Sequence, residues 1–284
     1  MPKVKIRSGI EMYYEVHGEG EPLVLIAGTG SHWQKWELFQ LPYFSKYYKT
    51  IVFDHRGTGQ SDMPDSPYSI EMFASDLAEL LDAISIKGPV HVVGHSMGGQ
   101  VAQQFALDYP DKVRGLVLAD TGSGPFPGHD FERGIPIVTA MTFAKVGTVA
   151  ERLKDSHLGE FWYTPEFREK RKDVMAKIIE SAMLWPPPLK PYLRHIIARQ
   201  NFNITDKLDR IVVPTLIMVG EDDKFAEGTG AFIKQCRHLY TKIRGSKLVV
   251  VPHARHGIFW EQPEFVNDTI HKFLKKVSKE SADA

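Results

Sequence analysis

The stretch that decides the fold is VHVVGHSMG at residues 90–98, in which an apolar run leads directly into the pattern G-x-S-x-G. The apolar run predicts a buried strand, and the motif lies where that strand is expected to give way to a helix. A turn of this kind forces Ser96 into a strained backbone conformation, so glycines are needed two positions before and two positions after it. The pattern therefore predicts a nucleophilic serine held out above the end of a strand.

The helix expected to begin at Met97 supports the same interpretation. The first N–H groups of a helix have no partner within it, and this end of the helix carries a partial positive charge. Both features would stabilise an oxyanion that forms beside the Ser96 hydroxyl. With 23 glycines in the chain the motif alone carries little weight, but its position directly after a strand favours a functional site.

Composition limits the classes of function. The 284 residues contain 35 basic and 35 acidic side chains, so no overall field attracts nucleic acid or an anionic membrane, and neither is expected as a partner. Cys236 is the single cysteine and the N-terminus lacks a secretory apolar stretch, which predicts a cytoplasmic protein. The most apolar long window, residues 134–150, is interrupted by Lys145 and is not expected to span a membrane.

Strand-like and helix-like segments alternate along most of the chain, which predicts a parallel sheet covered by helices on both faces. The strand-like runs are residues 4–6, 12–16, 23–27, 50–54, 90–94, 113–119, 214–220 and 247–251. The helical patterns lie at about residues 71–84, 97–109, 229–240 and 263–276, and residues 278–284 are expected to form a fraying tail.

The alternation stops between Asp120 and Thr205, where glycines and prolines are followed by helix-like stretches rich in Phe, Met and Trp. The consecutive prolines at residues 186–188 must interrupt any helix there. We therefore expect residues 1–121 and 207–284 to form one core that is discontinuous in sequence. Residues 122–206 are expected to form an inserted helical cap.

A serine nucleophile needs a histidine base, and the base needs a carboxylate that orients it. In this architecture the expected chain order is serine, acid, histidine. Glu221, Asp222 and Asp223 follow one predicted strand, and His253 and His256 follow the next. The spacing leaves alternatives open: Asp222 and the strand-end Asp120 compete with Asp223 as the acid, and His253 competes with His256 as the base.

Taken together, these motifs resemble the α/β-hydrolase family, in its capped, cofactor-free form. The resemblance implies a mostly parallel eight-stranded sheet flanked by helices, with an inserted helical cap. In that family the acid commonly stands third after the glycine that ends its strand, which matches Asp223, and the base precedes a Glu-x-Pro stretch, which matches His256. Residues 54–61 resemble the D-x-R-G-x-G-x-S loop that shapes the sheet edge.

The resemblance also implies an oxyanion hole formed by the backbone N–H groups of Thr29 and Met97. Relatives usually have His-Gly where this chain has Ala27-Gly28, a change that removes a side chain and keeps the backbone donor. A dinucleotide site is not expected around Gly28-Thr29-Gly30, because the third glycine of G-x-G-x-x-G would fall at Trp33. No histidine cluster has metal-site spacing, so no metal is expected. The resemblance implies that no other cofactor is used.

The cap supplies many large apolar side chains, which would line a pocket or pack between cap and core. The candidates for substrate binding are Phe143, Trp162, Met183 and Trp185, and a small apolar ester or lactone is the expected substrate. Arg194 and Arg199 could bind a carboxylate, although an isolated arginine on a helix more often faces solvent.

Two further functions stay open. One is a carbon–carbon bond hydrolase of dienoic ketones, although such relatives often have Asn before the serine and Trp after the base, where this chain has His95 and Gly257. The other is a ligand receptor without turnover on the same fold. The sequence does not determine the oligomeric state.

Overall fold

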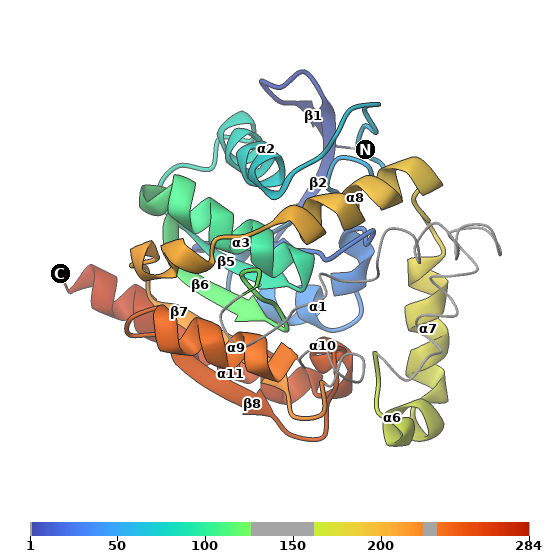
Figure 1. The fold of residues 1–284 in the computed structure, drawn as a ribbon, viewed down its shortest axis with the longest axis vertical. Helices are drawn as coiled ribbons and strands as arrows, with labels where there is room; N and C mark the ends of the chain where they lie inside the picture. The colour runs from blue at the N-terminus through green and yellow to red at the C-terminus, as the bar shows by residue number, and fades with distance from the viewer. Residues whose placement is uncertain (1, 126–161, 224–231, 284) are drawn as a thin grey trace.

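The computed structural model describes residues 2–125, 162–223 and 232–283, and these form one eight-stranded sheet with helices on both faces (Figure 1). The strand order is β1-β2-β4-β3-β5-β6-β7-β8, in which the β1–β2 and β2–β4 pairs are antiparallel and the other neighbouring pairs are parallel. The predicted mostly parallel sheet is therefore confirmed. The strands are β1 (Lys3–Lys5), β2 (Glu11–His17), β3 (Pro22–Ile26), β4 (Lys49–Phe53), β5 (Val90–His95), β6 (Val113–Ala119), β7 (Thr215–Gly220) and β8 (Lys247–Val251).

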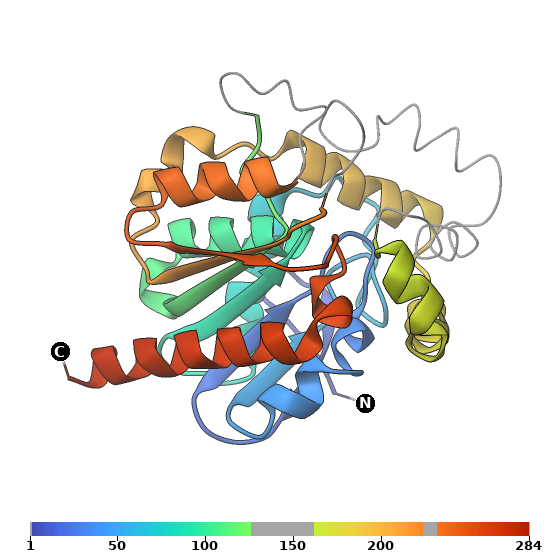
Figure 2. The ribbon, with the colours of Figure 1, turned by 90° about the horizontal axis from the view of Figure 1, so that it is seen from below.

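The helices divide between the two faces of the sheet, each over its own apolar cluster. One face carries α2 (Ile70–Ala83), α3 (Met97–Asp108) and α9 (Phe232–Lys242). The other carries α1 (Gln40–Phe44), α10 (Ile258–Glu261) and α11 (Pro263–Ala282), together with the short helix η1 (Trp33–Trp36). Two more short helices, η2 (Pro110–Lys112) and η3 (Thr205–Arg210), precede β6 and β7. Figure 2 shows α11 on one side of the sheet, with α3 and α9 on the other.

The two clusters follow from the strand period. Successive side chains of a strand point to opposite faces, so Val24 and Ile26 join the cluster under α3 whereas Leu23 and Leu25 join the cluster under α1. Because both faces are covered, the central strand β5 is buried at every position.

The inserted segment contributes helices in place of further βα units. In its described part these are α6 (Pro165–Lys170), α7 (Lys172–Ala182) and α8 (Leu189–Asn201). Residues 186–188 separate α7 from α8, as the run of prolines predicts. Where cap and core divide stays a prediction.

The predicted fraying tail is wrong, because α11 continues to Ala282. The reason is a tertiary contact that local sequence does not show. The Ser278 hydroxyl lies 3.0 Å from His91 Nε2 and donates a hydrogen bond to Glu21, so the last turns of α11 are held against the sheet. No helix in the described ranges is both long and apolar enough to cross a lipid bilayer.

Candidate active site

Ser96 lies between β5 and α3 in a strained conformation, with φ 57° and ψ −121°. A Cβ atom on Gly94 would lie 2.3 Å from the Gly98 carbonyl oxygen, and one on Gly98 would lie 2.2 Å from the Ile26 carbonyl oxygen. Both positions therefore require glycine. The Ser96 N–H donates a hydrogen bond of 2.9 Å to the carbonyl oxygen of Ala119, the last residue of β6, and this bond fixes the turn. The surrounding packing thus maintains the strain that the motif predicts.

The loop after β3 lies directly against Ser96. A Cβ atom on Gly28 would come within 3.8 Å of Ser96 Oγ, so the backbone of this loop closely approaches the hydroxyl. Thr29 is the next residue along that loop, and Met97 opens α3 on the other side of Ser96. This arrangement brings the two predicted oxyanion residues to the nucleophile from two separate elements.

Asp223 and His256 come together at the carboxyl ends of β7 and β8. His256 Nδ1 lies 3.0 Å from Asp223 Oδ2, and both residues are buried. The loops that carry them are tied together, because the Asp222 N–H donates to the carbonyl of Ala254 at 2.9 Å. With Nδ1 occupied by the carboxylate, Nε2 is the ring nitrogen that could accept a proton.

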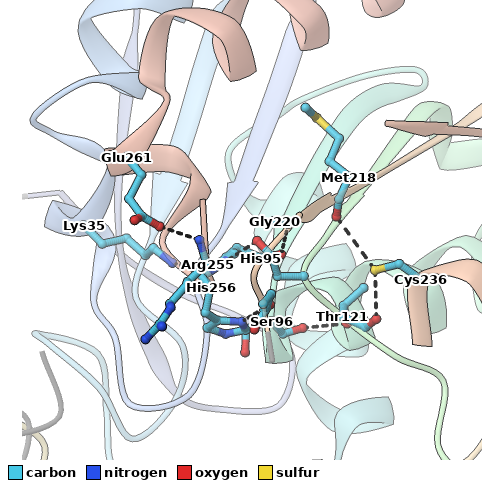
Figure 3. A network of polar contacts seen from close by, with 12 residues as sticks. Lys35, His95, Ser96, Thr121, Met218, Gly220, Cys236, Arg255, His256 and Glu261 are labelled. Carbon is cyan, nitrogen blue, oxygen red and sulfur yellow. Dashed lines mark hydrogen bonds and ion pairs between the residues drawn. The ribbon is translucent and has the colours of Figure 1, made fainter. Parts of the chain in front are cut away.

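His95 connects this pair to the nucleophile, since it directly precedes Ser96. Its Nε2 lies 2.9 Å from the carbonyl oxygen of His256, and the two imidazole rings have centroids 4.9 Å apart. Figure 3 shows Ser96, His95 and His256 within one cluster of side chains. His95 thus supports the backbone of His256 through this hydrogen bond.

The competing assignments differ in where the structure places them. His253 is exposed, has φ 53°, and its N–H donates to a Glu221 carboxylate oxygen. The His256 ring, by contrast, holds the hydrogen bond to Asp223. The site geometry thus places His253 outside the cluster.

Asp120 is not the hydrogen-bond partner of the His256 ring, but it lies beside Asp223, the predicted acid. Its Oδ1 accepts a hydrogen bond of 3.0 Å from the Gly220 N–H, and its carboxyl group lies close to that of Asp223. Burial, and next the negative charge of Asp223, raise the pKa of Asp120 well above its ordinary value. The neutral form of Asp120 is thus favoured beside Asp223.

Lys35 is a member of this cluster that the sequence analysis missed. Its Nζ lies 2.7 Å from His95 Nδ1, and 4.5 Å and 5.0 Å from the ring centroids of Trp36 and Trp260. A carbonyl can only accept, so His95 donates from Nε2 to His256 and accepts at Nδ1 from Lys35. Burial lowers the pKa of Lys35 to about 7, although the nearby Asp120 acts in the opposite direction. A lone lysine in a short helix carries no pattern that predicts this.

His95, Asp120 and His256 also place possible ligand atoms within 4.8 Å of one another. His95 Nε2 is already used as the donor to a carbonyl, and His256 Nδ1 as the partner of Asp223. These hydrogen bonds fit an acid–base arrangement better than a metal cage. The expectation that no metal is used stays a prediction.

The predicted substrate-binding residues have different locations. The Trp162 ring lies 4.9 Å from the His256 ring, edge to face, and the Trp162 carbonyl accepts a hydrogen bond of 2.7 Å from the Gly257 N–H. Met183 caps the end of α7, and Trp185 is 43% exposed. Phe143 lies outside the described residues.

A hollow adjoins the cluster. It lies between the loop after β3, η1 and α7, and its walls include Lys35, Trp162, Ile178 and Trp260. Of the predicted pocket residues, Trp162 therefore borders both this hollow and His256, the predicted base.

The loop at residues 54–61 supports the sheet edge, as the resemblance implies. Asp54 is buried and accepts hydrogen bonds from the N–H groups of Trp33 at 2.8 Å and Gln60 at 2.9 Å. Burial raises its pKa to about 6, against the effect of these two donors. Asp54 thus fixes η1, the helix that carries Lys35.

Comparison with known proteins agrees with the observed fold. The sequence profile of the alpha/beta hydrolase fold matches residues 21–263, so the chain belongs to the α/β-hydrolase family. It is 31% identical over 262 residues to a protein of Stutzerimonas stutzeri provisionally named carbamate hydrolase RutD, covering 87% of this chain and 90% of the relative.

Two solved structures are similar over almost the whole chain. The enol-lactonase from Burkholderia xenovorans has a TM-score of 0.82 and 25% identity, covering 96% of this chain and 100% of its own. A thermophilic esterase from Thermogutta terrifontis has a TM-score of 0.81 and 27% identity, covering 97% and 98%.

Proposed function

We propose that this protein is a serine hydrolase that cleaves a carboxylic ester or lactone through an acyl-enzyme on Ser96. The observation that carries the proposal is the buried hydrogen bond between His256 and Asp223, formed at the sheet edge where Ser96 stands in its strained turn. The names of the similar enol-lactonase and esterase support an ester or lactone as the substrate class.

In the proposed mechanism, His256 Nε2 accepts the Ser96 proton while Oγ attacks the substrate carbonyl. The N–H groups of Thr29 and Met97 hold the resulting oxyanion, and Asp223 stabilises the imidazolium. His256 then gives the proton to the leaving alkoxide. Water, activated by the same base, hydrolyses the acyl-enzyme and restores the Ser96 hydroxyl.

The carbon–carbon hydrolase alternative is disfavoured at the position after the base. A Cβ atom on Gly257 would lie 2.4 Å from the Tyr163 ring, so the place that a tryptophan would need is filled. A ligand receptor on the same fold would not turn over an ester or lactone, so a measurement of turnover distinguishes it from the proposed hydrolase.

The experiment measures steady-state hydrolysis of p-nitrophenyl esters of increasing chain length, lactones and ring-fission diketones. We expect wild-type turnover of esters or lactones, and a fall of about 10⁴-fold or more in Ser96→Ala. Ser75→Ala, on α2 away from the site, serves as the control and should keep full activity. A fluorophosphonate probe should label Ser96. Equal activity in Ser96→Ala, or absence of turnover in the wild type, would contradict the proposal.

A further inference from the structure

One face of α8 lies across the loop that carries Thr29. Tyr192, His195 and Arg199 recur at the spacing of one helix face. A Cβ atom on Gly30 would lie 2.7 Å from the Tyr192 ring, and His195 Nδ1 lies 3.5 Å from the Gly30 N–H. His195 Nε2 is in turn 2.8 Å from the carbonyl of Arg56. These contacts fix the height and rotation of α8 over the loop.

Arg199 thereby comes to lie against Thr29, on the loop that approaches Ser96. Its Nη1 donates to Thr29 Oγ1 at 3.2 Å, and Thr29 follows Gly28, whose backbone closely approaches Ser96 Oγ. The guanidinium is therefore close to the position that a scissile carbonyl would occupy between Ser96 and the Thr29 N–H.

The charge of Arg199 has no counter-ion within the described ranges. Thr29 Oγ1 is the one acceptor that it has there, although a guanidinium carries five N–H donors. The other arginines nearby are paired: Arg56 forms a buried ion pair with Asp76, and Arg194 pairs with Asp65. Burial lowers the pKa of Arg199, because the charged guanidinium is unfavourable where no opposite charge neutralises it.

The adjoining hollow also contains basic side chains without an acidic partner in its described walls. Its described walls contain Lys35 and Lys177 and no acidic side chain. Both the hollow and Arg199 border the loop at residues 28–32. An anion beside this loop would therefore meet the positive charges of Lys177 on α7 and Arg199 on α8. A planar carboxylate matches the fork of a guanidinium.

We propose that Arg199 binds a carboxylate of the substrate, and that the natural substrate is an ester or lactone with a carboxylate within a few bonds of the scissile carbonyl. This inference rests on the proposed function and narrows its substrate class, from carboxylic esters and lactones in general to those that also carry a carboxylate. Arg199 determines specificity, while Ser96, His256 and Asp223 perform the reaction.

The test compares matched substrates by following acid release in a pH-stat. Monomethyl succinate, glutarate and adipate carry the extra carboxylate; methyl butanoate, pentanoate and hexanoate are their neutral counterparts. We expect the wild type to prefer the anionic series. Arg199→Met should lower the ratio of kcat/KM between the two series by about 100-fold, mainly through KM, because a charge-assisted bidentate contact is lost. Arg199→Lys should lower the ratio by about 10-fold, because a point charge replaces the fork.

Arg194→Met is the matched control, since this arginine lies on the same helix and pairs with Asp65. It should leave the ratio unchanged. An Arg199→Met enzyme that loses both series equally would show that Arg199 only supports the Thr29 loop, and would overturn the inference. So would a wild type that prefers neutral esters.

A measurement on the unaltered enzyme covers the case in which Arg199→Met does not fold. Succinate should inhibit hydrolysis of a neutral ester competitively and at lower concentration than butanoate, and equal inhibition would overturn the inference. Ser96→Ala separates the two proposals. Retained activity in that variant would reject the acyl-enzyme, whereas its loss together with an unchanged specificity ratio in Arg199→Met would reject only the carboxylate site.

Discussion

At the scale of single residues, the candidate site depends on hydrogen bonds whose direction is fixed by chemistry. The His256 carbonyl can only accept, which sets the tautomer of His95 and makes Lys35 its donor. The Asp120 and Asp223 carboxyl groups can bond only if one of them is protonated. His256 is therefore held at its backbone carbonyl by His95 and Lys35, and at its ring by Asp223 and Asp120.

Asp120 provides a prediction at this scale. Asp120→Asn keeps a donor toward Asp223 and tolerates the residue's φ of 44°, so kcat/KM should fall by less than about 5-fold. Asp120→Gly also tolerates that φ but removes the donor, and should cost about 10–100-fold, because Asp223 loses its partner and the Gly220 N–H loses its acceptor. Steady-state kinetics on the favoured ester check this. Equal losses in the two variants would show that the hydrogen bond to Asp223 does not matter.

At the scale of elements, Glu261 joins the inserted segment to the loop of the base. One of its carboxylate oxygens accepts from the N–H of Thr164 and the other from the N–H of Arg255, each at 2.7 Å (Figure 3 shows the second bond). Arg255 directly precedes His256. The last residue of α10 thus sets the position of α6 and of the base together.

Replacing this carboxylate should loosen both elements. Glu261→Gln has one carbonyl oxygen for two backbone N–H groups, so one buried donor is left facing an amide N–H. The free energy of unfolding should fall by about 1–3 kcal/mol, and kcat should fall by about 10-fold, since the loop of His256 is less well held. Urea denaturation and steady-state kinetics measure the two effects.

Glu169→Gln, at an exposed position of α6, is the control for that change. It should alter stability by less than about 0.5 kcal/mol. A Glu261→Gln protein as stable and active as this control would mean that the two backbone donors find other acceptors.

At the scale of the whole molecule, the buried Lys35 should make global stability depend on pH. Its pKa is about 7 in the folded protein, mainly because burial disfavours the charge, and about 10.5 in an unfolded chain. The folded state therefore binds this proton more weakly, and unfolding takes up a proton between pH 7 and pH 10.5. The contribution of Lys35 to the free energy of unfolding rises with pH across this window.

Lys35→Met removes that titration. From pH 7 to pH 9.5 the wild type should gain about 2–3 kcal/mol of unfolding free energy relative to Lys35→Met. Urea denaturation of both proteins at the two pH values measures the gain, with Lys46→Met, at an exposed position, as a control that should track the wild type. A difference between wild type and Lys35→Met that does not change with pH would show that Lys35 is not held in a lowered-pKa environment.

The sequence by itself determined the sheet and the turn at Ser96, because these depend on local signals. The β5 run is apolar at both faces, and Gly94 and Gly98 stand where any side chain would collide with backbone. The sequence also predicts that Ser96, Asp223 and His256 lie at one edge of the sheet, because each follows a strand and parallel strands end at the same edge.

The tertiary structure alone decided which charges are buried and what faces them. Nothing in the local sequence distinguishes Arg194 from Arg199, which lie on the same helix. In the structure Arg194 pairs with Asp65, whereas Arg199 lies beside Thr29. Lys35 is hydrogen-bonded to His95, and Ser278 to Glu21, although the partners lie far apart in the sequence. The electrostatics of a side chain depend on partners brought together by packing, and no local pattern encodes those partners.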